Sequence, residues 1–335
     1  MKHPLQLFTI FFLIVFVLNG CNKKQNEEVK VGFLIHALDK ERWENDQDFF
    51  VAKVQELGGT VEVRIAENSA AKQLNQAKEL LTNGVDVLVI VPVDQFSAAE
   101  IVNEAHQKNV KVISYDRLIK NCKLDFYVST DNVEIGALQA DYLTTIRPNG
   151  NYALIGGAQS DNNSQFLYLG QMNVLQPLVE KGDISIVYNE FTNAWGEEEG
   201  YEQTKKLLKQ NNKVDAIIAG NDAIALGAIK ALGEAGKEGE VLVAGMDADL
   251  RNLQEIVAGH QTCTVYKPYE KMATTAAELA MKLGLALPCQ NTFQTVSNGK
   301  MLVPSVFHAA MIVNKENLKL TVISEGYQSE EEVYR

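Results

Sequence analysis

Polar and aromatic side chains follow the carboxyl ends of several short apolar runs in this sequence. Arg42 and Trp43 come shortly after the run VKVGFLI, and Asp116 and Arg117 come directly after VKVISY. Further along the chain, the same placement is found for Asn163, Trp195, Asn221, Asp247 and Lys267. The set combines charged groups and planar amides with the only two tryptophans of the chain.

This combination of side chains suits the binding of a sugar. Each sugar hydroxyl both donates and accepts hydrogen bonds, so carboxylates, amides and cationic groups can serve several hydroxyls together. The apolar C–H faces of a sugar ring can lie against indole rings, which bury a large area at a small entropic cost. Such binding needs no nucleophile, so the residues predict recognition rather than catalysis.

Each position also has a structural explanation that involves no ligand. Trp43 is spaced with Phe50, Val54 and Leu57 as on the apolar face of a helix. Arg42 could be a solvated surface residue, and Asp116 and Arg117 could form an ion pair within a loop. The segment Asp161-Asn162-Asn163, Asn221 and Asp247 could provide helix N-caps. Lys267 could be a lysine in a linker. The common position at strand ends favours one shared site, because unrelated surface residues have no reason to cluster by topology.

Apolar runs of strand length alternate with helical patterns from residue 29 onward. The expected strands are 30–35, 60–65, 86–91 and 111–115, followed by 152–155, 184–188, 216–219 and 241–244. Buried strands alternating with helices are typical of parallel sheets covered on both faces. The series occurs twice, which predicts an α/β fold of two doubly wound parallel-sheet lobes rather than one very wide sheet.

The last part of the chain departs from this alternation. A helix over 270–283 precedes three strand-like segments, TFQTV, VPSVFHAAMIV and LTVISEG. We therefore expect the chain to cross between the lobes several times and to form a multi-strand hinge. The expected N-terminal lobe is 29–131 with 268–305, and the expected C-terminal lobe is 132–267 with 306–335. Ligands bind beyond the carboxyl ends of strands in such sheets, so the cleft between the lobes is the expected site.

The N-terminus has the pattern of a secretory signal. The short basic region MKHP precedes the apolar run LQLFTIFFLIVFVL, and the segment Leu18-Asn19-Gly20-Cys21 resembles a bacterial lipobox. The resemblance implies a signal peptide over 1–20, lipid modification of Cys21, and a polar tether over 21–28. An uncleaved anchor is the alternative, although the apolar run is shorter than the roughly 20 residues of a spanning helix. Either way, we expect an exported chain held at a membrane, in the periplasm or at the cell surface.

Bulk composition and the remaining motifs exclude several classes of function. The formal charge of −12 over 335 residues argues against a nucleic-acid partner, which requires a basic footprint. Cys122, Cys263 and Cys289 match no zinc spacing and allow one disulfide at most, and buried or free thiols are favoured. The histidines show no HxH or HExxH pattern, DADLRN lacks the later residues of a calcium loop, and no GxSxG motif is present. We therefore expect no metal, no cofactor and no catalytic residues.

Longer segments resemble a known family. The stretches ERWENDQDFFVAK, VKVISYDRLI, GNYALIGG, GQMNVL, NNKVDAIIAGNDA, GMDADL and QTCTVYKP are similar to those of type I periplasmic sugar-binding proteins. The resemblance extends over residues 29–327. YDR is shared with ribose- and galactose-type members, whereas ERW and YKP indicate the D-xylose-binding proteins of ABC transporters. His36 stands where that group would carry an acidic residue, and the lipobox replaces the signal of a soluble protein.

The resemblance implies a role for each candidate residue. Hydrogen bonds to the sugar would come from Arg42, Asp116, Arg117, Asn163, Asn221, Asp247 and Lys267, and Trp43 and Trp195 would enclose the ring. A monomer that closes on D-xylose and delivers it to an ABC permease is expected. The same fold could instead feed a chemoreceptor or a sensor kinase, and a secreted sugar-modifying enzyme is a third hypothesis. A sugar-responsive repressor is disfavoured by the export signal and by the lack of a DNA-binding headpiece.

Overall fold

The structure is a computed structural model that describes residues 28–38, 41–210, 213–289 and 294–335. The expected signal peptide over 1–20, the expected lipidation at Cys21 and the tether, apart from Glu28, lie outside the described residues. In the described part of the chain, no helix combines the length and the apolar character needed to cross a membrane.

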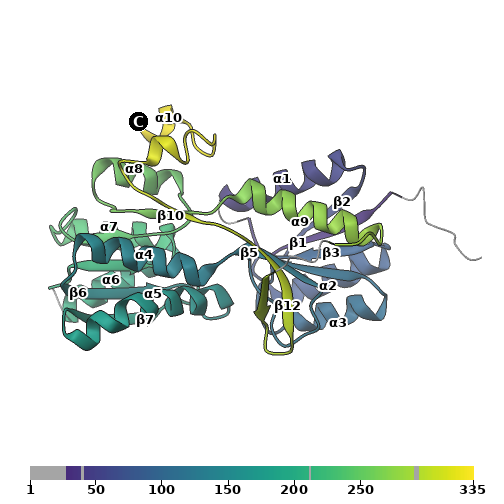
Figure 1. Cartoon of the computed structure of the whole chain (residues 1–335), viewed down its shortest axis with the longest axis horizontal. Helices are drawn as coiled ribbons and strands as arrows, with labels where there is room; N and C mark the ends of the chain where they lie inside the picture. Colours follow the sequence, from purple (N-terminus) through teal and green to yellow (C-terminus); the bar gives the residue numbers. More distant parts are fainter. Residues whose placement is uncertain (1–27, 39–40, 211–212, 290–293) are drawn as a thin grey trace, which may run out of the picture.

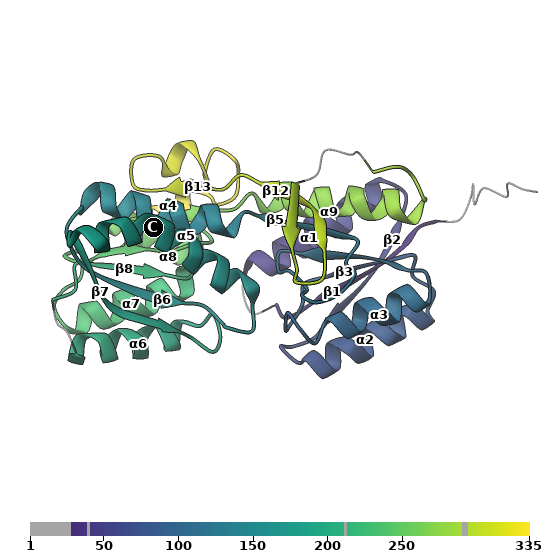
Figure 2. The ribbon, with the colours of Figure 1, turned by 60° about the horizontal axis from the view of Figure 1, so that its bottom comes forward.

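The first lobe is built on a seven-stranded sheet of order β11-β12-β5-β4-β3-β1-β2, in which only β11 is antiparallel to its neighbour. Its strands are β1 (Lys30–Ile35), β2 (Thr60–Ile65), β3 (Val87–Ile90), β4 (Lys111–Tyr115), β5 (Phe126–Thr130), β11 (Gln294–Ser297) and β12 (Leu302–His308). Helices α1 (Glu41–Glu56) and α9 (Tyr269–Gly284) cover one face, and α2 (Ala70–Thr82) and α3 (Ala99–Gln107) cover the other (Figure 2). Alternate residues of β1 explain the two layers, because Phe33 packs in the core under α1 and α9 whereas Leu34 packs under α2 and α3.

The second lobe is built on a four-stranded parallel sheet of order β7-β6-β8-β9. Its strands are β6 (Gly150–Gly156), β7 (Ile184–Phe191), β8 (Ala216–Ala219) and β9 (Leu242–Ala244). Helices α4 (Asn132–Ile146) and α5 (Asn162–Lys181) cover one face, and α6 (Glu197–Gln210) and α7 (Asp222–Glu234) cover the other. Helix α8 (Leu250–Ala258) follows β9 and packs against the C-terminal α10 (Glu330–Val333) (Figure 1).

Three passages of the chain join the lobes (Figure 1). One runs from β5 into α4, the second from β10 (Thr264–Tyr266) into α9, and the third from β12 into β13 (Met311–Val313). Strands β10 and β13 pair antiparallel beside the second sheet. The predicted fold class, two doubly wound lobes joined by a multi-strand hinge, is confirmed. The predicted lobe boundaries remain predictions, and β12 spans the one placed between residues 305 and 306.

Two features of the chain differ from the sequence-based expectation. Strand β5 was not among the predicted strands, although it lies within the range expected for the first lobe. In the structure Asp131 ends this strand by capping α4, accepting hydrogen bonds from the N–H groups of Val133 and Glu134. The segment LTVISEG is not a strand, since η1 (Leu318–Leu320) and successive turns occupy 318–326. There the Thr321 hydroxyl donates to the carbonyl of Asn317, a local bond that competes with strand pairing.

Helices α4 and α5 cross at glycines that allow their backbones to touch. A Cβ added at Gly170 would lie 1.9 Å from the carbonyl oxygen of Val133, and one added at Gly136 would lie 2.0 Å from that of Leu167. Helices α6 and α7 repeat this arrangement through Gly200 and Gly227. The starts of the two helices α4 and α5 are also in contact, since Asn132 Nδ2 donates a hydrogen bond of 3.1 Å to Asn163 Oδ1.

We expect Gly170→Ala to lower the free energy of unfolding by about 1–3 kcal/mol, because the new methyl group must push α4 and α5 apart. Urea unfolding followed by circular dichroism measures this change. The matched control is Leu169→Ala at the neighbouring position, whose side chain is 49% exposed and should change stability little. Equal stability of the two variants would show that the helix crossing tolerates a side chain.

Candidate functional site

A cavity of about 250 Å³ lies between the carboxyl ends of the two parallel sheets. All nine residues predicted from the sequence line it: Arg42, Trp43, Asp116, Arg117, Asn163, Trp195, Asn221, Asp247 and Lys267. The sequence-based set did not include the other lining residues, which are His36, Asn68, Val93, Ala158, Ser160, Asp161, Asn193, Ala194 and Met246. The structure therefore brings every predicted site residue to one place, as the strand-end rule requires.

Asp116 stands at the centre of a buried network of charges. Its Oδ2 lies 2.9 Å from Arg42 Nη2 and 3.4 Å from Lys267 Nζ, and its Oδ1 accepts a hydrogen bond of 3.1 Å from Asn163 Nδ2. Burial alone would raise the pKa of Asp116, but Arg42 and Lys267 outweigh that effect and hold its pKa well below the usual range. Asp116 is therefore a permanent anion at the floor of the cavity.

The backbone of two cavity carboxylates adopts an uncommon conformation. Asp116 has φ +60° and Asp247 has φ +114°, both in the left-handed region that non-glycine residues rarely occupy. The hydroxyls of Tyr127 and Ser129 donate to the carbonyl of Asp116 at 2.7 and 2.8 Å, so the surrounding strand holds this conformation in place. Backbone strain of this kind gathers at ligand sites, where it directs a side chain that a relaxed strand end would not.

Arg42 is fully buried although it lies in the first turn of α1. Its guanidinium lies between two rings, 3.9 Å from the centroid of Trp43 and 4.2 Å from that of Tyr269. Asp46 lies one helical turn further on and pairs with it at 3.2 Å. The surface-residue explanation for Arg42 is therefore wrong, and the positive charge at this helix start is matched by carboxylates.

Asp46 supports the cavity from behind. It accepts hydrogen bonds from Arg42 and from the hydroxyl of Tyr115. Burial raises the pKa of Asp46 to about 6, against the opposing effects of Arg42 and of the Tyr115 hydroxyl. Asp46 does not line the cavity, and it was not among the residues predicted from the sequence. The sequence feature that could have identified Asp46 was its four-residue spacing from Arg42 on the same helix face.

Arg117 connects the two lobes. Its Nε lies 2.8 Å from Oδ2 of Asp161, which caps α5, and its Nη2 lies 3.2 Å from Nε2 of His36. The loop ion pair with Asp116 that its neighbouring position suggested is replaced by this contact across the cleft. Asp161 follows the same strand as Asn163, and of this segment only Asn163 was included in the predicted set.

Residues that line the cavity on the side of the second lobe make different local contacts. Asn221 caps α7, because its Oδ1 accepts a hydrogen bond of 3.0 Å from the N–H of Ile224, and it also lines the cavity. Asp247 does not cap α8, which begins after Asp249. Instead Asp247 Oδ1 accepts a hydrogen bond of 2.9 Å from Tyr269 and lies 3.2 Å from Lys267 Nζ. Lys267 is 1% exposed, so it is not a linker lysine.

A buried aspartate behind the cavity holds the loop that carries Asp247. Asp222 accepts hydrogen bonds from the N–H of Asp249 at 3.0 Å and from the hydroxyl of Thr264 at 2.9 Å. The same hydroxyl accepts the N–H of Ala248, which follows Asp247. Burial, together with Asp249 and Asp247, raises the pKa of Asp222 well above its usual value. Its side chain therefore positions the loop rather than contacting a ligand.

The two tryptophans are held differently. Trp43 is 4% exposed and belongs to the core under α1 and α9, so its helical spacing with Phe50 and Val54 did indicate core packing. Trp195 is half-buried, and its ring lies on the backbone of Gly157, where an added Cβ would be 2.1 Å from Cζ3. The indole Nε1 of Trp195 is buried and has no hydrogen-bond partner among the described residues. Trp195 therefore offers both a ring and an unused donor near the cavity.

The cationic side chains that line the cavity form ion pairs with its carboxylates. Arg42, Arg117 and Lys267 each lie within ion-pair distance of an aspartate. This pairing argues against a metal ion in the cavity and leaves rigid donors and acceptors suited to neutral hydroxyls.

Comparison with known proteins shows the family of the chain. The family described as "Periplasmic binding protein domain" matches residues 31–286. The chain belongs to this family. It is 43% identical over 309 residues to the D-xylose-binding periplasmic protein of Escherichia coli, covering 92% of this chain and 93% of that protein. The protein of the same name from Haemophilus influenzae is 40% identical over 310 residues, covering 92% of this chain and 93% of that protein.

A solved structure extends the comparison to the fold. A carbohydrate transporter solute binding protein from Chloroflexus aurantiacus, in complex with D-glucose, aligns with a TM-score of 0.86 at 29% identity. The alignment covers 92% of this chain and 98% of that one. The resemblance to type I periplasmic sugar-binding proteins is thereby confirmed, as is the expectation of a binding protein rather than an enzyme.

Proposed function

We propose that this chain is an extracytoplasmic lipoprotein that closes on one monosaccharide, D-xylose, and delivers it to an ABC importer. The observation that carries the proposal is the convergence of nine strand-end residues on a single cavity between two lobes. The names of the relatives from Escherichia coli and Haemophilus influenzae support D-xylose as the sugar. Cys21 would anchor the chain to the membrane through a lipid.

The size and chemistry of the cavity fit a single sugar ring. A volume of about 250 Å³ lies below the range of drug-sized pockets, which suits a monosaccharide rather than a longer chain. Asp116 and Asp247 supply acceptors, and Arg42, Arg117 and Lys267 supply donors. Trp43 comes from the first lobe and Trp195 from the second, so closure of the lobes would bring both rings to the sugar. This is the hinge motion known for periplasmic binding proteins.

Contacts between the lobes support a closed state that the sugar would stabilise. Besides the pair Arg117–Asp161, the Gln95 N–H donates to the carbonyl of Ser160 at 3.1 Å, and its Nε2 donates to that of Gln159 at 3.2 Å. Gln95 follows β3 in the first lobe, and both acceptors follow β6 in the second. Opening of the cleft would separate these donors from their acceptors, so the energy of the bonds would add to the apparent affinity for the ligand.

Gln95→Ala is expected to weaken sugar affinity about two- to tenfold, the equivalent of one hydrogen bond, because it removes a bond of the closed state. The side chain of Gln95 does not line the cavity, so the change would act on closure. Isothermal titration calorimetry measures the affinity. Gln107→Ala, at an exposed position in α3, is the control. An unchanged affinity would show that the Gln95 side chain contributes nothing to closure.

The substrate assignment is tested with the purified chain from residue 22 onward. Tryptophan emission and calorimetry are followed while D-xylose, L-arabinose, D-ribose, D-glucose and D-galactose are added separately. We expect D-xylose to bind with the highest affinity. Binding of another sugar without binding of D-xylose would refute D-xylose as the substrate. No response to any of the sugars would refute sugar binding itself.

A further inference from the structure

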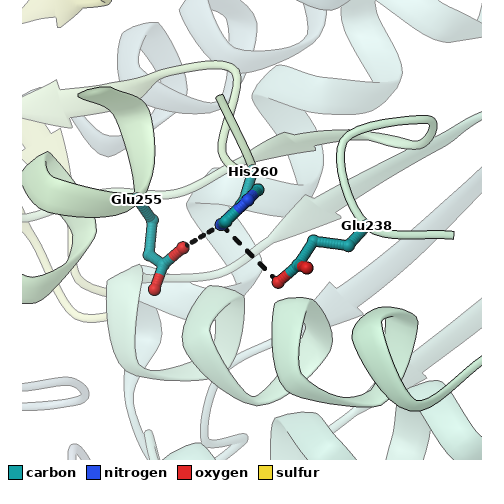
Figure 3. Close-up of side chains that lie close together, drawn as sticks. All are labelled: Glu238, Glu255 and His260. Atoms are coloured by element: carbon teal, nitrogen blue, oxygen red, sulfur yellow. Dashed lines mark hydrogen bonds and ion pairs between the residues drawn. The ribbon is translucent and has the colours of Figure 1, made fainter. Parts of the chain in front are cut away.

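Two glutamates and a histidine meet at the end of the second lobe opposite the cavity (Figure 3). Glu238 lies in the connection before β9, Glu255 lies in α8, and His260 follows that helix directly. Met246 and Asp247, which line the cavity, follow the other end of β9. The three side chains therefore play no part in the sugar site.

The donor atoms of this cluster are close enough to share one cation. His260 Nδ1 lies 2.7 Å from Glu255 Oε2 and 3.5 Å from Glu238 Oε1, and the three donor atoms all lie within 4.8 Å of one another. Ligands at zinc distances of roughly 2.0–2.2 Å are about 3.4 Å apart in a tetrahedron. The observed spacing therefore requires only small side-chain shifts.

The backbone holds the histidine beside Glu255. Helix α8 ends at Gly259 with φ +91°, and the N–H of His260 donates to the carbonyl of Glu255 at 2.9 Å. The N–H of Gly259 donates at the same time to the carbonyl of Ile256 at 3.2 Å. These two bonds form a Schellman motif, which sets the direction of the chain after a helix. His260 and Glu255 are thus placed by the fold.

Glu238 reaches the cluster from another element. Its carboxylate lies over Gly233 of α7, where an added Cβ would be 3.5 Å from Oε1. The next residue, Gly239, has φ +73°, and a Cβ there would be 3.4 Å from the carbonyl oxygen of Gly259. The two connections are therefore in contact, and Glu238 faces His260 across that contact (Figure 3).

The charge of the cluster is only partly balanced by cationic side chains, because Arg251, one helical turn before Glu255, pairs with Glu197 and acts on Glu255 from a longer distance. Neither Glu238 nor Glu255 forms an ion pair with a lysine or arginine of the described residues, so a single ring nitrogen faces two carboxylates. The pair of His106 with Asp125 differs, because Lys111 Nζ lies 2.9 Å from the same carboxylate. One proton on His260 can satisfy the cluster only in part. A divalent cation would satisfy all three donors and cancel both negative charges.

We infer that Glu238, Glu255 and His260 form a binding site for a divalent transition-metal ion of the Zn²⁺ class. One imidazole with two carboxylates matches the ligands that Zn²⁺ takes, whereas Ca²⁺ and Mg²⁺ prefer oxygen ligands alone. The three side chains are 31–43% exposed, so water completes the coordination. The ion joins the connection before β9 to the end of α8 and stabilises the second lobe without touching the cavity.

The test is calorimetric titration of Zn²⁺ into the chain from residue 22 onward, without a histidine tag and after removal of metals by a chelating resin. We expect one Zn²⁺ per chain and a rise in the unfolding temperature. His260→Gln should lower the affinity at least about tenfold, as expected for the loss of one of three ligands. His106→Gln is the matched control and should leave Zn²⁺ binding unchanged. Circular dichroism checks the folding of each variant.

A second variant keeps the test decisive if His260→Gln does not fold. Glu238 lies in a surface connection, so Glu238→Gln should keep the fold and still weaken Zn²⁺ binding. No Zn²⁺ uptake by the unaltered chain, or uptake by the Glu238 and His260 variants equal to that of the unaltered chain, would show that the cluster is an ion pair only. D-xylose affinity measured in the same samples separates this result from a failure of the proposed function, because the two sites share no residue.

Discussion

Asp116→Asn is expected to weaken sugar binding about a hundredfold and to lower the free energy of unfolding by about 3–5 kcal/mol. The carboxylate is the shared partner of Arg42 and Lys267, both almost fully buried. Its neutralisation leaves buried positive charge that the remaining carboxylates match only in part. A buried ion that loses its partner is far more costly than the intact pair is favourable.

The asparagine substitution separates charge from backbone strain. Asparagine tolerates the left-handed conformation that Asp116 adopts, so φ +60° does not by itself penalise the variant. Calorimetry with D-xylose and urea unfolding without sugar measure the two effects. Asp48→Asn, an exposed position on α1, is the matched control. Near-normal stability of Asp116→Asn would mean that Asp46 and Asp247 alone balance the cations.

The location of the site could be predicted because topology determines it. Parallel strands present their carboxyl ends at one edge, so residues as distant in sequence as Arg42 and Lys267 were assigned to one cleft without any contact information. The alternation of apolar strands and helices was enough for this step. The unpredicted strand β5 did not disturb it, because that strand ends at the hinge and none of the predicted residues follows it directly.

The pairing of charges within the site could not be predicted. Arg117 follows Asp116 in sequence, which suggested a local ion pair, yet it contacts Asp161 across the cleft. That contact depends on how one lobe is placed against the other, and no local pattern encodes it. The burial of Lys267 is a similar case, because it depends on where the chain crosses between the lobes. His36 directly follows β1 and so has the strand-end position, but it was noted only as a departure from the family pattern, although it contacts both Arg117 and Trp43.

The helical spacing of Trp43 illustrates a different limit of sequence reasoning. The spacing indicated core packing, the strand-end position indicated a ligand contact, and the structure places this ring in the core and on the cavity wall at once. The two explanations were treated as alternatives, but a large aromatic ring can fill a core with one face and border a cavity with another. Only the packing of the folded chain shows that both hold.

Replacement of the two tryptophans by alanine should therefore have different effects on stability. Trp43→Ala is expected to lower the free energy of unfolding by about 3–5 kcal/mol, because it empties a core position and removes the ring beneath the Arg42 guanidinium. Trp195→Ala should lower it much less, since that ring is half-buried on the backbone of Gly157. Both variants should weaken D-xylose binding at least about tenfold, through lost ring area and stacking.

Phe50→Ala completes the comparison, because Phe50 is fully buried against Phe33 and does not line the cavity. It should lose stability as Trp43→Ala does and, in the fraction that stays folded, keep its sugar affinity. Calorimetry is the measure of binding, because tryptophan emission changes with the variants themselves. If Trp195→Ala bound D-xylose normally, the second lobe would hold the sugar through its polar groups alone, and the unpaired indole Nε1 would have no ligand to explain it.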